Sequence, residues 1–151
     1  MAKALRDAGK LPAAAIDLSD APGPGPRMAS ATRLTARRVS VTVAHDRGAS
    51  LLAQGSNGID WSAFTWHAGG EHGADAVSGR IAGPSAIELD FPGDLPTSGA
   101  PRLRYCWWPG HRGDRLIVDD WHRNRPAKYN AVPNIGAIVF PLRRDAIGVA
   151  V

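Results

Sequence analysis

The chain of 151 residues contains a single cysteine, Cys106, which excludes an internal disulfide. Long hydrophobic runs are also missing, because no segment approaches the roughly 18–20 apolar residues that a membrane helix needs. Residues 1–16 are interrupted by Arg6, Asp7 and Pro12, so they lack the uninterrupted apolar centre of a signal peptide. We therefore expect a protein that has no membrane span and is made in the cytoplasm.

Clustered positive charge is scarce, although the net charge is +4 and the sequence pI is about 9.8. Of the 18 basic residues only three are lysine, and the arginines form no group tighter than pairs such as Arg37–Arg38 and Arg143–Arg144. A nucleic-acid-binding segment usually shows a basic helix or a run of about five to eight basic residues. We interpret these arginines as ordinary surface charge and expect no nucleic-acid partner.

Short runs in which apolar and polar residues alternate are abundant. Residues 39–43 place three valines on one face of a strand, with Ser40 and Thr42 on the other. Residues 86–91 and 103–107 repeat the pattern, and 17 glycines and 12 prolines supply many turns. The sequence predicts an all-β fold, an antiparallel two-sheet β-sandwich of roughly eight strands. Candidate strands lie near residues 30–35, 37–44, 49–53, 59–66, 76–82, 85–91, 101–108, 114–118, 135–142 and 146–150.

The N-terminal segment differs from the rest in composition. Residues 2–9 fit a short helix, and within residues 20–26 proline alternates with glycine from Pro22 onward, which excludes regular structure there. We expect a short N-terminal helical or extended arm over residues 1–27 and a β-sandwich domain over residues 28–151. An extended arm offers free backbone donors and acceptors, so it is suited to docking on a partner.

Several short motifs follow one another in the order of a known module. They are residues 8–12, 16–18, 28–32, 39–51, 78–83, 87–89 and 101–105, the last followed, after Cys106, by an aromatic residue. Together they resemble the β-rich C-terminal module of sialate O-acetylesterase-like SGNH hydrolases, including versions found in phages and prophages. The resemblance covers residues 8–118, and it implies a β-sandwich that accompanies a hydrolase domain.

The catalytic domain of that family is almost entirely missing from this chain. It carries an early nucleophilic serine, oxyanion-hole glycine and asparagine blocks and a late Asp-x-x-His, but no Gly-Asp-Ser or Gly-x-Ser-x-Gly occurs here. The resemblance implies a non-catalytic carbohydrate- or protein-binding module, used as a surface, spike or adaptor component of a phage or phage-like particle. Its partners would be a glycan or other virion proteins. The alternatives are the C-terminal part of a divided or truncated carbohydrate O-acetylesterase, acting with a separate catalytic chain, and a purely structural domain.

Two constellations contain chemically active residue types. Asp119 and His122 have the Asp-x-x-His spacing that supplies an esterase with a base and its orienting carboxylate, but no serine has an elbow context. Residues 67–75 gather two histidines and two carboxylates, which are ligand types for zinc or calcium. Their spacing is not that of a zinc-binding helix, and three glycines indicate a solvated hairpin loop. We expect no catalytic residue, no metal site and no cofactor.

Tryptophan is over-represented, with five in the chain. Flat indole faces bind the apolar faces of sugars, and polar neighbours bind the hydroxyls. Trp61 and Trp66, and likewise Trp107 and Trp108, would point to opposite faces of regular strands, and we expect about three of the five in the core. Cys106 is predicted to be a buried structural thiol. The candidate carbohydrate-binding residues are Trp66, Trp108, His111, Asp114, Trp121, His122 and Arg125, unless all five tryptophans are structural.

Overall fold

The chain folds into antiparallel β-sheets. The computed structural model describes residues 25–46, 48–54, 56–107, 115–120 and 142–151. Within these residues there are ten strands and one short 3-10 helix, and every strand pairing is antiparallel, so the predicted all-β class is confirmed. No helix in these ranges is long and apolar enough to cross a membrane. Most of the arm predicted for residues 1–27, and almost all of the strand predicted at 135–142, lie outside the described residues.

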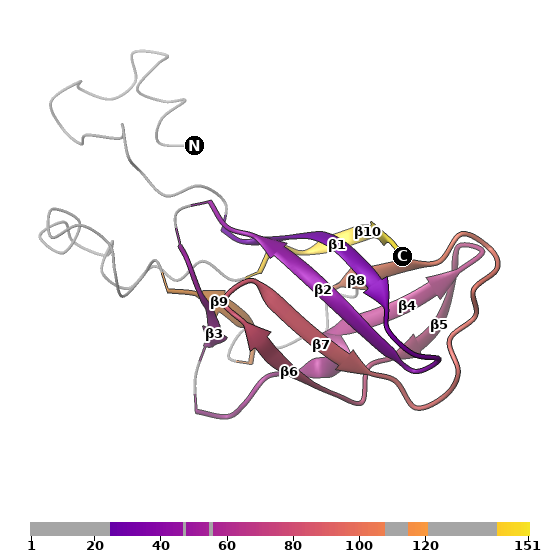
Figure 1. The fold of residues 1–151 in the computed structure, drawn as a ribbon, viewed down its shortest axis with the longest axis horizontal. Helices are drawn as coiled ribbons and strands as arrows, with labels where there is room; N and C mark the ends of the chain where they lie inside the picture. The colour runs from indigo at the N-terminus through magenta and orange to yellow at the C-terminus, as the bar shows by residue number, and fades with distance from the viewer. Residues whose placement is uncertain (1–24, 47, 55, 108–114, 121–141) are drawn as a thin grey trace, which may run out of the picture.

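Two four-stranded sheets contain eight of the ten strands in the described residues. The strands are β1 (Arg27–Arg33), β2 (Arg38–Ala44), β3 (Leu51–Ala53), β4 (Phe64–Ala68), β5 (Glu71–Asp75), β6 (Ser78–Gly83), β7 (Ala86–Asp90), β8 (Arg102–Tyr105), β9 (Ile117–Asp119) and β10 (Asp145–Ala150). The first sheet has the order β1-β2-β7-β6, and the second has the order β10-β8-β4-β5. Strands β3 and β9 form a separate pair. Figure 1 shows the first sheet in front of the second, with β3 and β9 at one end.

The core lies between the two sheets and follows from the alternating pattern. Val39 and Val41 in β2 pair with Leu89 and Ile87 in β7, and none of these four side chains is exposed. The second sheet contributes the other half of the same buried cluster, with Phe64, Trp66, Leu103 and Tyr105 at 0 to 1% exposure. Because successive side chains of a strand point to opposite faces, one apolar face per sheet suffices to build this core.

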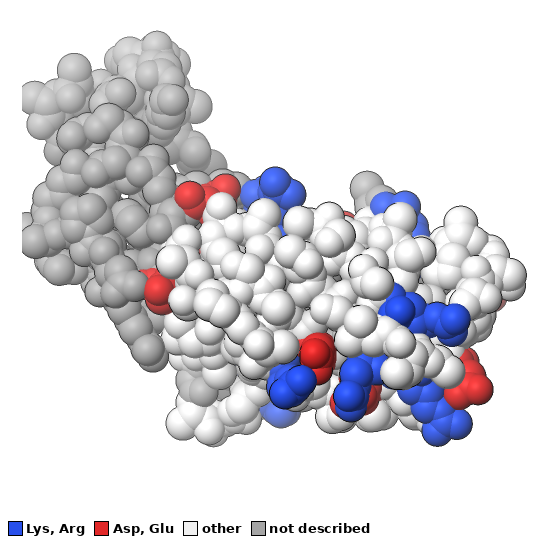
Figure 2. Space-filling model, in the orientation of Figure 1, with Lys and Arg blue, Asp and Glu red and all other residues white. Residues whose placement is uncertain are grey.

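The outer face of the first sheet carries paired charges. Arg38 donates to Asp90 at 2.7 Å, and Arg80 donates to Glu88 at 2.6 Å. The hydrogen bond from Arg38 is the main reason why the pKa of Asp90 lies below its ordinary value. Figure 2 shows blue and red side chains next to one another over this face, so the positive charge there is locally balanced.

The segment read as a solvated hairpin loop, residues 67–75, is a strand pair instead. Gly69 and Gly70 both have positive φ, 63° and 80°, and form the two-residue turn between β4 and β5. The register shift opposite Trp66 and His67 leaves Gly73 as the additional residue of β5. The three glycines therefore mark a tight turn and a bulge rather than an open loop.

The strand predicted over residues 59–66 begins later than expected. Residues Trp61–Ala63 form the 3-10 helix η1, and β4 starts at Phe64. Ser62 donates its hydroxyl proton to the Asp60 carboxylate at 2.5 Å, a local contact that competes with extended structure. Trp61 consequently packs, partly buried, against the same core as Trp66, so the prediction that the two face opposite ways is wrong.

Candidate binding site

Trp66 is the only predicted carbohydrate-binding residue within the described ranges. Its side chain is 1% exposed, and its ring lies edge-on to Phe91 with the ring centroids 6.3 Å apart. An indole buried in this way offers no face on the surface, so the prediction of an exposed sugar platform at Trp66 is wrong. The other predicted residues lie outside the described part of the chain: Trp108, His111, Asp114, Trp121, His122 and Arg125.

The central strand β4 is buried on both faces. Phe64 and Trp66 face the core, whereas Thr65 and His67 face outward, yet Thr65 is 1% and His67 is 2% exposed. Outward residues of a sheet normally contact water, so other side chains must cover these two. The His67 ring contacts the rings of Trp107 at 4.9 Å and His72 at 5.4 Å, between centroids. The outer face of the second sheet therefore has a covered centre.

Trp107 reaches this face because of the residue before it. Tyr105, the last residue of β8, packs inward on Phe64 with ring centroids 4.6 Å apart. In a continuous strand Trp107 would share that inward face. Cys106 instead has a φ of 50°, and its N–H donates to the carbonyl of Ala63 at 2.9 Å. The left-handed residue ends the strand and turns Trp107 to the opposite face.

Cys106 differs from its predicted role as a buried thiol within a strand. It follows β8, and its side chain is only partly buried. That burial still raises the pKa of the Cys106 thiol above its ordinary value. The thiol is therefore protonated at neutral pH and a poor nucleophile. Its importance lies in the backbone turn that it makes.

We call the group on this face the His–Trp cluster: Thr65, His67, His72, Asp75 and Trp107. The ring of Trp107 lies nearly parallel to that of His72, with 26° between the planes and 5.6 Å between the centroids. His72 in turn contacts Asp75, with 2.7 Å from Nε2 to Oδ1, and both side chains are about half exposed (42% and 50%). The cluster thus combines an aromatic surface with an accessible carboxylate and imidazole.

Arginine side chains border the cluster on the β8 side. Arg104 is opposite Thr65 in the ladder, and Arg102 is opposite His67. Burial lowers the pKa of His67 to about 4, and the charges of Arg104 and His72 act in the same direction. His67 is therefore neutral at pH 7. Its Nδ1 and the Nε of Arg104 are buried without a hydrogen-bond partner among the described residues.

The two acidic residues of the predicted Asp-x-x-His motif have other contacts. Asp119 is 2% exposed, and its Oδ2 lies 3.5 Å from Nδ1 of His45. A Cβ on Gly48 would meet the Asp119 carboxylate at 2.3 Å, so only glycine fits beside it. These contacts fasten the segment before β3 to β9.

Asp120 holds the same segment through the backbone. Its carboxylate accepts the N–H groups of Ala49 at 2.7 Å and Ser50 at 3.1 Å. Burial alone would raise the pKa of Asp120, but these hydrogen bonds outweigh it and keep the pKa below its ordinary value. The Asp120 carboxylate is thus ionised and holds the backbone of the segment before β3. His122 lies outside the described residues.

No metal site emerges from the histidines and carboxylates of residues 67–75. Among the described residues, no three His, Cys, Asp or Glu side chains are grouped so that they could hold an ion. His72 and Asp75 instead contact each other, and His67 contacts Thr65 at 2.9 Å. The chemistry of this face is hydrogen bonding and stacking.

Sequence reasoning missed Trp107, His72 and Asp75 as members of one site. The signal was present in Gly69-Gly70, since a two-glycine turn pairs its flanking residues in a hairpin. That pairing places His67 opposite His72. The position of Trp107 could not be inferred, because Cys106 gives no sequence sign of a left-handed conformation.

Comparison of the chain with family models, with curated proteins and with solved structures found no match. The resemblance to the accessory module of SGNH hydrolases accordingly stays a prediction made from short motifs. Function has to be inferred from the residues of the fold and their contacts.

Proposed function

We propose that this chain is a non-catalytic carbohydrate-binding module whose ligand lies on the outer face of the second sheet. The placement of Trp107 carries the proposal. A non-glycine residue in the left-handed region costs on the order of 1–3 kcal/mol, and such residues concentrate at functional sites. Here the left-handed Cys106 brings a large aromatic side chain out of the core and onto a polar sheet face.

The surroundings of Trp107 suit a sugar. An indole ring packs against the C–H face of a pyranose, and groups at its edge bind the hydroxyls. Asp75 supplies an accessible acceptor, and His72 and Arg104, whose charge acts on the neighbouring His67, supply donors. Because β4, β5 and β8 are hydrogen-bonded neighbours, these groups are held on a rigid surface that needs little ordering when a ligand binds.

The particle setting belongs to the same proposal and is supported by the resemblance alone. A module of this kind would serve as a surface, spike or adaptor component that attaches a phage-like particle to a glycan. The divided O-acetylesterase is the alternative, and it requires a nucleophile from a separate chain, because no serine of this sequence has an elbow context.

A glycan array followed by affinity measurements tests the proposal. The purified chain is expected to retain at least one class of glycan. For that glycan, Trp107→Ala should weaken binding about tenfold or more, which corresponds to about 1.4 kcal/mol, and Asp75→Asn should weaken it several-fold.

The matched control is Arg80→Gln, because Arg80 is exposed on the outer face of the first sheet. This variant should bind like the wild type. If the array retains no glycan, or if Trp107→Ala keeps full affinity with an unchanged far-UV spectrum, the proposal is wrong. Trp107→Phe is a milder second variant that should retain part of the affinity.

A further inference from the structure

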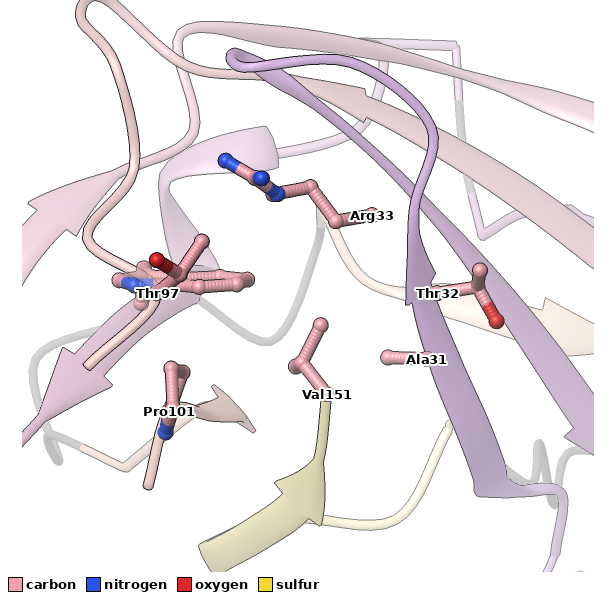
Figure 3. Close-up of a pocket in the computed structure, with 7 residues that line it drawn as sticks. Ala31, Thr32, Arg33, Thr97, Pro101 and Val151 are labelled. Carbon is pink, nitrogen blue, oxygen red and sulfur yellow. The ribbon is translucent and has the colours of Figure 1, made fainter. Parts of the chain in front are cut away.

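A pocket of about 200 Å³ lies where the two sheets meet at β1 and β10, away from the His–Trp cluster. Its wall is formed by β1, by the segment before β8 and by the end of the chain after β10 (Figure 3). The lining residues are Ala31, Thr32, Arg33, Trp66, Thr97, Pro101 and Val151. Residues of β1 and β4, of the loop before β8 and of the segment after β10 thus line one space.

The wall of the pocket is mainly apolar. Ala31 on β1 and Pro101 before β8 lie on opposite sides of the space, and the side chain of Val151 points into it from below in Figure 3. Trp66, at 1% exposure, closes the inner side with a small part of its ring surface. A ligand that fills this space would exchange water for apolar contacts on several sides.

The mouth of the pocket carries one cationic group. The side chain of Arg33 extends from β1 across the top of the space toward Thr97 (Figure 3). Its guanidinium donates to the carbonyl of Leu95 through one long hydrogen bond of 3.4 Å. Among the described residues, no carboxylate lies within 4.0 Å of Arg33, in contrast to Arg37, Arg38 and Arg80. A guanidinium that lacks an acidic partner is suited to a ligand carboxylate, which it can bind through two parallel hydrogen bonds.

We propose that this pocket binds small carboxylates built on one six-membered apolar ring, of the benzoate type. An apolar cavity of about 150 Å³ is enough for benzene, so this space holds a ring together with a carboxylate. The ring contacts Ala31, Pro101 and Val151, and the carboxylate lies at Arg33. This site is separate from the glycan face, and neither proposal depends on the other.

Titration with benzoate, followed through amide NMR shifts of the full chain, tests this site, with benzamide as the neutral probe of the same shape. Benzoate should shift the amides of residues 31–33 and 97, and it should bind at least tenfold more tightly than benzamide. Arg33→Gln should remove that preference, and Ala31→Leu, which fills the space, should abolish binding of both probes. The matched control is Arg37→Gln, because Arg37 lies in the connection between β1 and β2 and is paired with Asp94. This variant should leave binding unchanged.

Four results would overturn the proposal. The first is the absence of any shift up to about 10 mM benzoate, which corresponds to a binding free energy weaker than about 3 kcal/mol. The second is a set of shifts that map away from the pocket. The other two are an unchanged preference for benzoate in Arg33→Gln and unchanged binding in a folded Ala31→Leu. If Ala31→Leu does not fold, the proposal is tested by the location of the wild-type shifts and by the loss of the preference for benzoate in Arg33→Gln. Trp107→Ala should bind benzoate normally, so failure of the glycan proposal is distinguishable from failure of this one.

Discussion

Ala100 and Cys106 have left-handed backbone conformations, with φ of 49° and 50°. Side chains with a Cβ disfavour this region, at a cost on the order of 1 kcal/mol or more. At Cys106 the strained turn determines which face of the sheet receives Trp107. At Ala100, which is exposed in the segment before β8, no such consequence is visible. The strained backbone at Cys106 therefore orients a side chain of the proposed site, whereas the strained backbone at Ala100 lies in a connecting segment.

Ala100→Gly is expected to stabilise the protein. Glycine adopts positive φ without the Cβ penalty, and this gain exceeds its additional entropy in the unfolded chain. We expect the free energy of unfolding in urea to rise by about 0.5–1 kcal/mol. The control is Ala44→Gly in strand β2, where Ala44 is paired in register with Arg27 and glycine should lower the same quantity by a similar amount. A loss of stability in Ala100→Gly would contradict the left-handed assignment.

His67 gives the protein a pH dependence of known sign. Its pKa is lowered to about 4 in the folded state by burial and by Arg104 and His72, with Asp75 opposing, whereas a free histidine has a pKa near 6.5. Between about pH 6.5 and 4 the unfolded chain binds the additional proton, so stability falls as the pH falls through this window. We expect a contribution of about 2 kcal/mol or less, because water near the surface screens the cluster.

His67→Gln removes this titration and should flatten the fall of urea stability between pH 6.5 and 4. The matched control is His72→Gln, because His72 is 42% exposed and should leave most of the slope in place. Equal slopes in wild type and His67→Gln would show that His67 is not buried as described.

At the scale of elements, strand β10 depends on a glycine bulge. The register against β8 shifts between Asp145 and Val149, and Gly148 in between has a φ of 81°. Its N–H donates to the Asp145 carboxylate at 2.6 Å, which fixes the bulge. A Cβ at Gly148 would lie 2.4 Å from the carbonyl oxygen of Leu103, so a side chain would force the two strands apart.

Gly148→Ala should therefore destabilise the fold by about 2–3 kcal/mol, through the clash and the unfavourable φ together. Thermal or urea unfolding measures this directly. Gly93→Ala is the control, since a Cβ there meets no atom within 4 Å and should change stability by less than about 0.5 kcal/mol. If Gly148→Ala unfolds like the wild type, the described pairing of β8 and β10 is incorrect.

Strands with strict alternation were predictable, and strands held by local turns were not. The valines of residues 39–43 indicated β2 and its buried face, and residues 86–91 indicated β7 in the same way. Strand β5 has no apolar side, because its residues are almost all exposed, so no period of two marks it. Its existence follows from the Gly69-Gly70 turn and from pairing with β4, and this pairing creates the His–Trp cluster.

At the scale of the whole molecule, the two sheets share one core but differ in their outer faces. The first sheet shows paired charges, whereas the second shows the His–Trp cluster bordered by arginines. The sequence predicted the all-β sandwich, but it placed a candidate binding residue at Trp66, which is buried, and the other candidates in segments outside the described residues. Trp107, and not Trp66, lies on the outer face of the second sheet because Cys106 has a φ of 50°. Neither the composition nor the spacing of residues predicts that angle.

A shared core predicts a single unfolding transition. Ile87→Ala in the first sheet and Leu103→Ala in the second remove side chains with 0% exposure and should each cost about 2–5 kcal/mol. Far-UV circular dichroism and tryptophan fluorescence should report the same urea midpoint in each variant. Two separate transitions, with only one sheet affected by each substitution, would contradict a common core.

Amide NMR shift mapping with the best-retained glycan tests the central claim most directly, because it locates the ligand on the wild-type fold. We predict that the shifts concentrate on β4, β5 and the end of β8, around His72, Asp75 and Trp107. They should be lost in Trp107→Ala and unaffected by Arg80→Gln. Shifts centred on the outer face of the first sheet, or the absence of any shift with every glycan class tested, would contradict the account.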